Sequence, residues 1–421
     1  MTQQNQKYYP NLKDITQAKL NLNTIVSATP LMKNPNLSED LSSNIFLKRE
    51  DLQIVRSYKI RGAYNKISGL SEEERQRGIV CASAGNHAQG VAYSCQLLGI
   101  QGKIYMPTTT PKQKINSVKM FGKDKIQVVL VGDTYDAASD AAHRDCLETG
   151  MVYIHPFDDP QIIEGQATVG VEILQDFVGT IDYLFIPIGG GGLASGVGAY
   201  FKQISPNTKI IGVEPAGAAS MKASIEAGAV VSLKEIDKFV DGAAVQRVGD
   251  LTFGICQKVI DDIVLVPEGK VCTTILELYN QNAIVVEPAG ALSIAALDFY
   301  KDEIKDKNVV CIVTGSNNDI TRTEEMKERS LLYEGLKHYF IVRFPQRAGA
   351  LRDFVDKVLG PNDDISMFEY YKKTSREEGP ALIGIELQDK EDFAGLEQRM
   401  EENGFISEYI NDRPDLFQFL V

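Results

Sequence analysis

The heptapeptide Ser57-Tyr58-Lys59-Ile60-Arg61-Gly62-Ala63 contains a lysine between a strand-like stretch, residues 44–48, and a helix predicted to begin near Ser57. A lysine taken alone is most simply interpreted as a solvated surface charge. Three loops rich in glycine and small polar residues change that interpretation. Their sequences are Ser83-Ala84-Gly85-Asn86-His87, Gly189-Gly190-Gly191-Gly192-Leu193 and Thr314-Gly315-Ser316-Asn317. Together with these loops, Lys59 is predicted to belong to a functional site.

The length and composition are those of a globular protein with more than one domain. The 421 residues exceed what one ordinary core contains, so two or three domains are predicted. The chain is 43% hydrophobic and 24% charged, which is ordinary for a globular protein. Its formal net charge of −13 argues against partners that are nucleic acids or anionic membrane surfaces.

The compartment is predicted from what the sequence does not contain. The first twenty residues are polar and do not resemble a signal peptide. No apolar run approaches the ~18 residues needed to cross a bilayer. The six cysteines form no CxxC pair and have no metal-ligand spacing, so we interpret them as reduced thiols. We therefore expect a cytoplasmic protein, with no membrane partner and no metal site.

Strand-like and helix-like segments alternate over the first three quarters of the chain. Apolar strand-like runs lie at residues 78–83, 103–106, 126–131, 183–188, 209–214, 263–266 and 309–314, and helix-like segments lie at 86–98, 111–121, 133–149 and 161–177. This order predicts an α/β fold of parallel sheets covered on both faces by helices. Residues 1–320 are predicted to form one domain, in which a smaller lobe at about 55–155 is inserted into a larger one.

The pattern changes after residue 320. Residues 321–334 are charged and helical, and we predict that they form a neck. Residues 335–421 then follow the order strand, helix, strand, strand, helix, strand, at 337–344, 348–359, 365–372, 381–388, 391–403 and 405–411. This order predicts a ferredoxin-like α+β domain.

The four glycines at 189–192 lie between a buried strand-like run and a helix-like segment, residues 193–203. Glycines let the backbone approach an anion, and the free N–H groups of a helix start point toward it, so a phosphate site is predicted. A dinucleotide is an alternative, because Gly189-x-Gly191-x-x-Ala194 fits that fingerprint and Glu214 ends the next strand-like run. The mid-chain position of the motif counts against a dehydrogenase, which would also leave Lys59 without a role.

The two other loops supply polar groups at strand ends. Ser83, Ala84, Gly85, Asn86 and His87 precede or open a helix, where a carboxylate is stabilised by free N–H groups and the helix dipole. Helix capping by Ser83 is the alternative. His87 has no second ligand at metal spacing, so it is predicted to brace the loop.

Thr314 ends a strand-like run with a hydroxyl group. A hydroxyl can face a pyridine nitrogen without forcing it to be protonated, and capping of the strand end is the alternative. A lysine able to form a Schiff base, a phosphate cradle and polar groups for a planar ring are together typical of a pyridoxal 5'-phosphate site.

With these residues assembled, the chain resembles the threonine dehydratases (threonine ammonia-lyases), within the tryptophan-synthase-β-like group of pyridoxal phosphate enzymes. The resemblance extends over nearly the whole chain. Its landmarks are ATPL at 28–31, LKREDLQ at 47–53, SYKIRGA at 57–63, SAGNHAQG at 83–90, GGGGL at 189–193, DGAAVQRVG at 241–249, EPAGA at 287–291 and TGSNN at 314–318.

The resemblance implies roles for particular residues. Lys59 is implied to carry the cofactor, Asn86 to contact its ring hydroxyl, and Thr314 to face its ring nitrogen. The cofactor phosphate is implied to lie on Gly189, Gly190, Gly191, Gly192 and Leu193. Tyr58 stands where phenylalanine is common in the family. Ser220 stands where some relatives have an aspartate that binds a divalent cation, and it lacks that charge.

The implied reaction is the deamination of L-threonine to 2-oxobutanoate and ammonia. An L-serine dehydratase or racemase of the same group is the alternative, although Ala84 replaces the second catalytic serine of serine racemases. The C-terminal domain resembles a single regulatory ACT-like domain of a biosynthetic enzyme. By this resemblance L-isoleucine is the expected effector, with L-valine as an opposing one, and a homodimer or homotetramer is expected.

Overall fold

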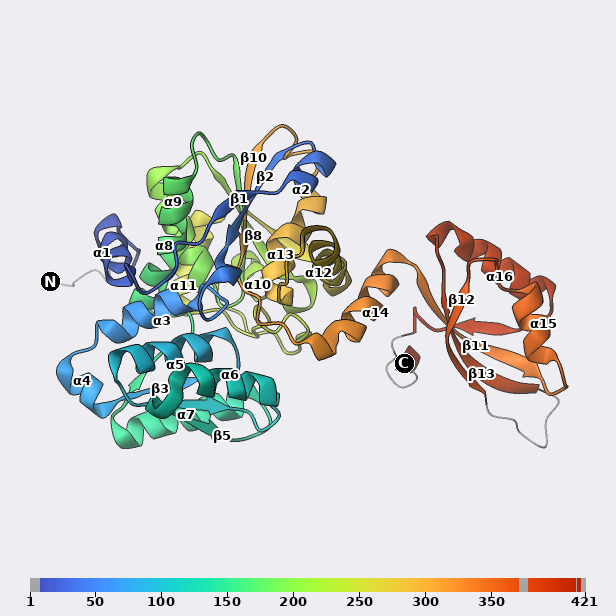
Figure 1. Cartoon of the computed structure of the whole chain (residues 1–421), viewed down its shortest axis with the longest axis horizontal. Helices are drawn as coiled ribbons and strands as arrows, with labels where there is room; N and C mark the ends of the chain where they lie inside the picture. Colours follow the sequence, from blue (N-terminus) through green and yellow to red (C-terminus); the bar gives the residue numbers. More distant parts are fainter. Residues whose placement is uncertain (1–7, 371–377, 414, 418–421) are drawn as a thin grey trace. The chain divides into compact units, whose positions relative to one another are not determined.

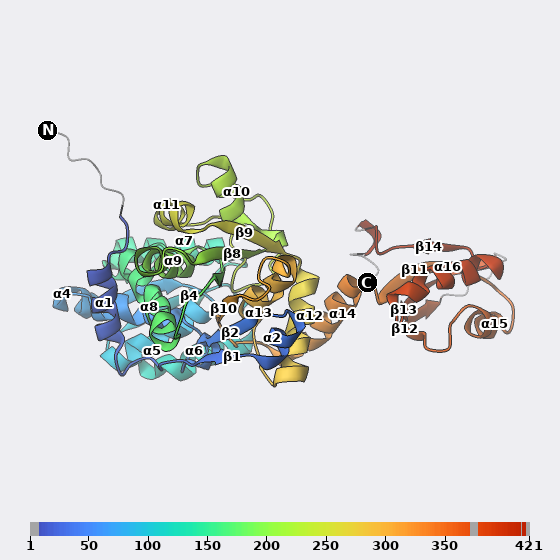
Figure 2. The same ribbon diagram turned by 90° about the horizontal axis from the view of Figure 1, so that it is seen from above.

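The computed structural model describes residues 8–370, 378–413 and 415–417. The chain divides into two compact units, Met1–Ile320 and Thr321–Val421, which are shown in Figure 1 and Figure 2 and are described separately below. In the described parts of the chain, no helix combines the length and the apolar character that crossing a membrane requires.

The larger lobe of the first unit contains a six-stranded sheet with the order β1-β2-β10-β7-β8-β9 (Figure 1). Every neighbouring pair is parallel except β1 and β2, which are antiparallel. The central strands are buried on both faces, as in parallel sheets that are covered by helices on both sides. The strands are β1 (Leu31–Lys33), β2 (Asn44–Arg49), β7 (Tyr183–Pro187), β8 (Lys209–Pro215), β9 (Asp262–Val266) and β10 (Asn308–Val313).

The smaller lobe contains a parallel four-stranded sheet with the order β5-β4-β3-β6. Its strands are β3 (Ile79–Ala82), β4 (Gly102–Met106), β5 (Ile126–Leu130) and β6 (Val152–Tyr153). In sequence they all lie between β2 and β7 of the larger sheet. The predicted fold of two parallel-sheet lobes is therefore confirmed, although the two-residue strand β6 was too short to be recognised from the sequence.

Helices cover both faces of the larger sheet. Leu184 and Ile186 of β7 pack on the side of α9, whereas the intervening Phe185 contacts Tyr300 on the opposite side. The helices of the first unit are α1 (Leu12–Leu22), α2 (Pro35–Asp40), α3 (Lys59–Ser68), α4 (Glu72–Arg77), α5 (Asn86–Leu98), α6 (Lys112–Gly122), α7 (Tyr135–Thr149), α8 (Pro160–Asp176), α9 (Gly192–Ile204), α10 (Ser220–Ala227), α11 (Asp250–Val259), α12 (Glu268–Asn282) and α13 (Pro288–Ala295).

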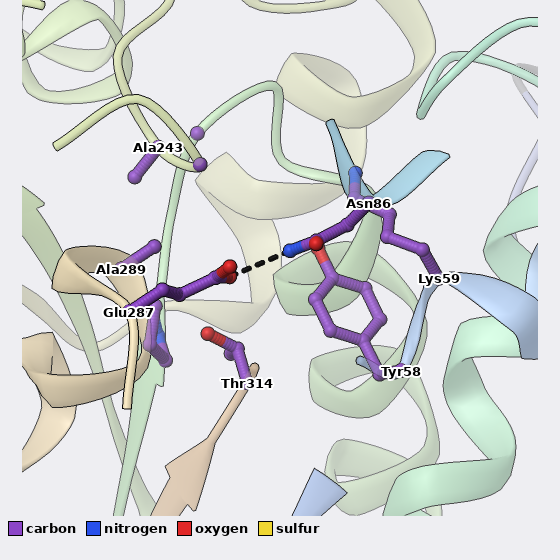
Figure 3. Close-up of a pocket in the computed structure, with 10 residues that line it drawn as sticks. Tyr58, Lys59, Asn86, Ala243, Glu287, Ala289 and Thr314 are labelled. Atoms are coloured by element: carbon purple, nitrogen blue, oxygen red, sulfur yellow. Dashed lines mark hydrogen bonds between the residues drawn. The ribbon is translucent and has the colours of Figure 1, made fainter. Parts of the chain in front are cut away.

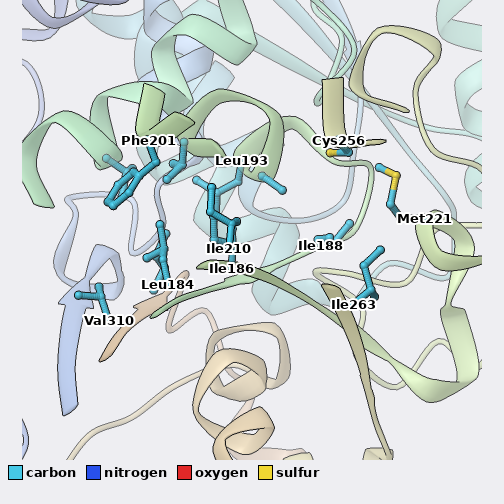
Figure 4. Close-up of a cluster of buried hydrophobic side chains, with 14 of the residues drawn as sticks. Leu184, Ile186, Ile188, Leu193, Phe201, Ile210, Met221, Cys256, Ile263 and Val310 are labelled. Atoms are coloured by element: carbon cyan, nitrogen blue, oxygen red, sulfur yellow. The ribbon is translucent and has the colours of Figure 1, made fainter. Parts of the chain in front are cut away.

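The main hydrophobic core lies between β7 and α9 (Figure 4). Ile186 and Ile188 pack there with Leu193 and Phe201, and all four side chains are almost fully buried. Burial of each side chain of this size contributes about 1.5–3 kcal/mol. Because the glycine loop 189–192 joins β7 to α9, this core holds both ends of that loop.

The second unit has an antiparallel four-stranded sheet with the order β12-β13-β11-β14. This is the order of a ferredoxin-like fold, so that prediction is confirmed for the described residues. The elements are α14 (Thr323–Glu334), β11 (Lys337–Pro345), α15 (Ala350–Lys357), β12 (Asp364–Tyr370), β13 (Glu378–Glu386), α16 (Phe393–Glu402) and β14 (Ser407–Tyr409). Residues 371–372 of the predicted strand 365–372 lie outside the described residues.

Candidate active site

Lys59 is the first residue of α3, and Tyr58 precedes it as the N-cap. The helix begins two residues later than the predicted start near Ser57, because Ser57 pairs with Gly315 in an isolated antiparallel bridge. The backbone N–H of Tyr58 also donates to the Thr314 carbonyl at 3.3 Å. These contacts hold the lysine beside the carboxyl end of β10, where ligands bind in open parallel sheets.

A pocket surrounds the Lys59 side chain (Figure 3). It is lined by Tyr58, Lys59, Asn86, Pro187, Gly189, Gly242, Ala243, Glu287, Ala289 and Thr314. Four residues predicted from the sequence therefore come together here, and these are Lys59, Asn86, Gly189 and Thr314. The other predicted site residues are not among the lining residues, and these are Ser83, Ala84, Gly85, His87, Gly190, Gly191, Gly192 and Leu193.

The environment of Lys59 favours its neutral amine. Burial lowers the pKa of Lys59 from 10.5 to about 8, although the Glu287 carboxylate acts in the opposite direction. The amine donates a hydrogen bond to the Pro156 carbonyl at 3.2 Å. A neutral amine is a nucleophile and a base, so this lysine is suited to covalent and proton-transfer chemistry.

Asn86 is the first residue of α5, which follows β3 of the smaller lobe. The N-cap of this helix is Gly85, and no side chain caps it. The alternative interpretation of Ser83 as the helix cap is therefore wrong, since its Oγ accepts a 3.2 Å hydrogen bond from the Gly85 N–H. The uncapped helix start leaves backbone N–H groups free for an anion.

His87 braces the start of α5. Its Nε2 lies 3.0 Å from the Ile154 carbonyl oxygen, next to β6. Burial lowers the pKa of His87 to about 3, so its imidazole is neutral at physiological pH. The bracing role predicted for His87 is confirmed, and a direct role in binding a substrate remains a prediction.

The glycine loop is shaped by contacts that the sequence did not reveal. A Cβ at Gly190 would lie 2.2 Å from the Phe157 ring, and Gly191 has a φ of +91°, so neither position tolerates a larger residue. The Thr252 hydroxyl donates to the Gly190 carbonyl at 2.6 Å. The N-cap of α9 is Gly191, and no side chain caps that helix, which leaves its first N–H groups for an anion.

The Thr314 hydroxyl is buried at the end of β10 and has no hydrogen-bond partner among the described residues. A buried hydroxyl without a partner costs about 1–3 kcal/mol. The alternative role as a strand-end cap would need a bond that this hydroxyl does not make. A ligand atom in the pocket can supply the missing partner.

Glu214 does not belong to a cluster of metal ligands. Its carboxylate accepts hydrogen bonds from the backbone N–H groups of Met221 and Lys222, at 2.7 and 2.8 Å, at the start of α10. Burial raises the pKa of Glu214 to about 7. Among the described residues no group of three or more His, Cys, Asp or Glu side chains could hold a metal ion.

A buried network of charges holds the helix that carries Lys59. The Arg61 guanidinium donates to both oxygens of Glu50, at 2.7 and 2.8 Å, and to both oxygens of Glu172, at 2.8 Å each. Lys48 donates to Glu172 at 2.8 Å. Arg61, Lys48 and Glu50 are completely buried, so the network ties β2, α3 and α8 together.

Several pocket residues were not predicted as site residues. Glu287, Gly242, Ala243 and Ala289 lie within DGAAVQRVG at 241–249 and EPAGA at 287–291, which were noted as landmarks without a role. A glutamate directly before a proline and a helix start is only a weak signal of a functional site, because a glutamate in that position usually caps the helix. Phe157 lies in no quoted motif, and nothing in the sequence links it to Gly190.

Comparison with known protein families defines the class of this protein. Residues 22–315 match the family of pyridoxal-phosphate dependent enzymes, and residues 328–420 match the C-terminal regulatory domain of threonine dehydratase. The protein is thus a pyridoxal-phosphate-dependent enzyme with a regulatory domain, and the dehydrogenase alternative is removed.

The relatives then define the family. The chain is 59% identical over 410 residues to the biosynthetic L-threonine dehydratase of Halalkalibacterium halodurans, covering 97% of this chain and 99% of that one. The corresponding enzyme of Bacillus subtilis is also 59% identical, with 97% of each chain covered. The processed form of threonine deaminase isoform 2 from Solanum lycopersicum has a TM-score of 0.72 and 43% identity, covering 76% of this chain and 95% of that one. The chain belongs to the threonine dehydratase family.

The pocket fits the cofactor of this family. Pyridoxal phosphate needs an amine, a partner for its ring nitrogen and a site for its phosphate. Lys59 supplies an amine whose pKa is lowered by burial, and Thr314 supplies a hydroxyl that has no partner in the part of the chain that the structure describes. The loop at Gly189 leads directly into the uncapped start of α9.

Proposed function

We propose that this protein catalyses the deamination of L-threonine to 2-oxobutanoate and ammonia, with Lys59 as the residue that holds pyridoxal phosphate and as the catalytic base. The observation that supports the proposal most directly is a lysine with a pKa lowered to about 8 in the same pocket as the buried hydroxyl of Thr314, which has no partner among the described residues. The substrate is inferred from the names of the relatives.

Three residues of the pocket and the glycine loop would hold the cofactor at four points. Lys59 would bond to its aldehyde carbon, Asn86 would donate to its ring hydroxyl oxygen, and Thr314 would face its ring nitrogen. The glycine loop from Gly189 to Leu193 would hold the phosphate at the start of α9. When bound, pyridoxal phosphate withdraws electrons from the bond that is broken at the substrate Cα.

Lys59 is also proposed to move the proton. After the substrate amine has taken its place, the Lys59 amine is free to remove the hydrogen on Cα. The low pKa of Lys59 matters here, because at pH 8 about half of an amine with a pKa of about 8 is neutral.

The loop of Ser83, Ala84, Gly85, Asn86 and His87 is proposed to bind the substrate carboxylate. Support comes from the start of α5, where no side chain occupies the first N–H groups. Ala84 has no hydroxyl that could return a proton to the opposite face of Cα. Elimination is therefore proposed in preference to racemisation.

The proposed reaction is tested by incubating the purified, cofactor-loaded protein with single amino acids. L-Threonine should yield 2-oxobutanoate and ammonia in equal amounts, which chromatography and an ammonia assay can measure. The kcat/KM for L-serine should be lower than that for L-threonine by a factor of about ten or more. L-Serine lacks a methyl group, which contributes about 1–3 kcal/mol in an apolar pocket. Faster turnover of L-serine would make the protein a serine dehydratase, and formation of D-serine would make it a racemase.

Capture of the cofactor by the unloaded protein should depend on pH in a defined way. Only the neutral Lys59 amine can attack an aldehyde, and its pKa is about 8. The rate should therefore fall about tenfold for each pH unit below 8 and should become level above it. Stopped-flow absorbance measures this rate, and Nα-acetyl-lysine is the control, with a rate that rises up to about pH 10.5. A protein rate that also rises to pH 10.5 would contradict the burial of this amine.

Regulation by L-isoleucine, with L-valine as an opposing effector, is proposed for the second unit. Residues 328–420 match a regulatory domain, and none of the pocket residues around Lys59 lies in this unit. Strands β12 and β14 form the edges of its described sheet and could pair with a second copy in a homodimer or homotetramer. Effector control requires different affinities in two states, typically with ~1–3 kcal/mol of coupling.

Removal of the second unit should abolish this regulation. In the full chain, millimolar L-isoleucine should raise the L-threonine concentration for half-maximal rate by about tenfold, which is within the usual range of coupling. A chain that ends at Glu334 should keep its activity and lose the response. D-Isoleucine at the same concentration is the control ligand. An unchanged threonine saturation curve in the full chain, with no heat of isoleucine binding, would leave the unit as a dimerisation domain.

A cytoplasmic location is also proposed. All six cysteines are free thiols in the structure, which agrees with a reducing compartment.

A further inference from the structure

Glu287 is a charged residue of the pocket that the proposed function leaves without a role. It directly precedes α13, yet its side chain makes no capping hydrogen bond to that helix. The carboxylate instead extends toward Asn86 across the pocket, as Figure 3 shows. Glu287 is 5% exposed, so this arrangement places a carboxylate in the protein interior.

The contacts of Asn86 fix the orientation of its amide. Its Nδ2 donates to Glu287 Oε1 at 2.6 Å, and its Oδ1 accepts from Asn317 Nδ2 at 2.6 Å. Asn317 Nδ2 also donates to the Val55 carbonyl at 2.9 Å, and a carbonyl can only accept. At the other end of the amide Glu287 Oε1 is the acceptor, so both ends of the Asn86 amide face groups with a defined role. A flipped amide would lose both hydrogen bonds.

This arrangement leaves one N–H of Asn86 for the pocket. The amide nitrogen has two hydrogens, and Glu287 takes one of them. The nitrogen has no second acceptor among the described residues, although Asn86 lines the pocket. The chain therefore fixes Asn86 as a hydrogen-bond donor at this point.

The backbone at Gly315 leaves space for the Glu287 carboxylate. The N–H of Glu287 donates to the Gly315 carbonyl at 3.1 Å. A Cβ at Gly315 would lie 2.5 Å from Glu287 Oε1, so only glycine permits this approach. The EPAGA and TGSNN motifs are thus in contact through Glu287 of the first and Gly315 of the second.

Burial of the Glu287 carboxylate in the pocket costs free energy. Glu287 forms no ion pair with any described residue, and burial, followed by Asp241, raises the pKa of Glu287 to about 7. The hydrogen bond from the Asn86 side chain, the charge of Lys114 and the hydrogen bond from the Asn317 backbone favour the ionised form. A glutamine or leucine would be easier to bury at this position.

We infer that Glu287 is a positioning residue, whose carboxylate orients the Asn86 amide so that its free N–H donates to the ring hydroxyl oxygen of the bound cofactor. This inference rests on the proposed function, because it assigns Asn86 to the cofactor. It adds a residue that acts through Asn86 without touching the ring.

The test is a double-mutant cycle on the full chain with Glu287→Ala, Asn86→Ala and the double variant. Cofactor affinity is measured by titrating the unloaded protein with pyridoxal phosphate, and the absorbance spectrum of each loaded variant is recorded. Each single variant should bind about tenfold more weakly, the loss expected for one hydrogen bond to a charged group. Both should show the same displacement of the cofactor absorbance band, and the double variant should show little further change.

Two further variants distinguish an effect on the orientation of Asn86 from a general effect on folding. Glu287→Gln keeps the side-chain volume and one acceptor oxygen, so its affinity should lie between those of the wild type and Glu287→Ala. Glu268→Ala is the matched control, because Glu268 also lies at a helix start, as the first residue of α12, and accepts from the Gly217 N–H at 2.8 Å outside the pocket. Its spectrum and affinity should equal those of the wild type.

The outcomes distinguish this inference from the proposed function. Additive losses in the double variant, or a wild-type spectrum and affinity in both Glu287 variants, would overturn the inference and leave the proposed function intact. A wild-type protein that binds no pyridoxal phosphate would overturn both.

Discussion

Replacement of Lys59 by alanine is expected to lower the rate of 2-oxobutanoate formation by about 10³-fold or more, since a general base alone typically contributes 10²–10⁴-fold. The same change removes the amine that holds the cofactor, so the visible absorbance of the purified protein should also disappear. Lys59 is the first residue of α3, and its amine makes one hydrogen bond, to the Pro156 carbonyl. The fold should therefore survive the substitution.

The control for this prediction lies on the same helix. Lys66 pairs with Asp159 at 2.8 Å, and it is not among the residues that line the pocket. Lys66→Ala should keep the absorbance and most of the activity. Full activity in Lys59→Ala, measured with circular dichroism as a check on folding, would contradict the assignment of Lys59.

Replacement of Arg61 by alanine is expected to have the largest effect on stability. It would leave the carboxylates of Glu50 and Glu172 buried without their common partner, which typically costs about 3–5 kcal/mol. Burial would raise the pKa of Glu172, but Arg61 and Lys48 outweigh burial and lower it to about 2. Because this pKa is lower than the value of 4.5 in an unfolded chain, the stabilisation is complete above pH 4.5 and is lost as the pH falls toward 2.

Thermal unfolding followed by circular dichroism measures this effect at neutral pH. Arg247→Ala is the control, because its pair with Asp250 is exposed and such pairs contribute about 0–1 kcal/mol. A variant with Arg61→Met and Glu50→Gln should recover part of the lost stability, since Glu172 keeps Lys48 and Lys19 as partners and no carboxylate then remains unpaired. Equal unfolding temperatures for Arg61→Ala and Arg247→Ala would contradict the role of the network.

The secondary structure of the central elements was predictable because it depends on local pattern. The runs that became β5 and β7 are apolar and bounded by turn residues, so their ends were predicted to within one residue. Helix α5 was predicted with the observed bounds, Asn86–Leu98. The predicted start of α3 was wrong by two residues, because the Ser57–Gly315 bridge joins positions that are far apart in sequence.

Part of the candidate site was predictable for a related reason. Asn86, Gly189 and Thr314 each follow an apolar strand, and the carboxyl ends of parallel strands are where ligands bind. Phe157 and Glu287 were not predicted as site residues, because their contacts have no local signature. Glu287 meets Asn86 across 201 positions of sequence.

The sequence by itself determined the family, the alternation of strands and helices, and the lysine at the centre of the site, since motifs and periodicity are properties of neighbouring residues. Tertiary structure alone decided that the Lys59 amine has a pKa near 8, that Thr314 lacks a partner among the described residues, and that a carboxylate accepts from Asn86. These properties depend on burial and on which distant groups face each other, and both arise only when the two lobes pack around the pocket.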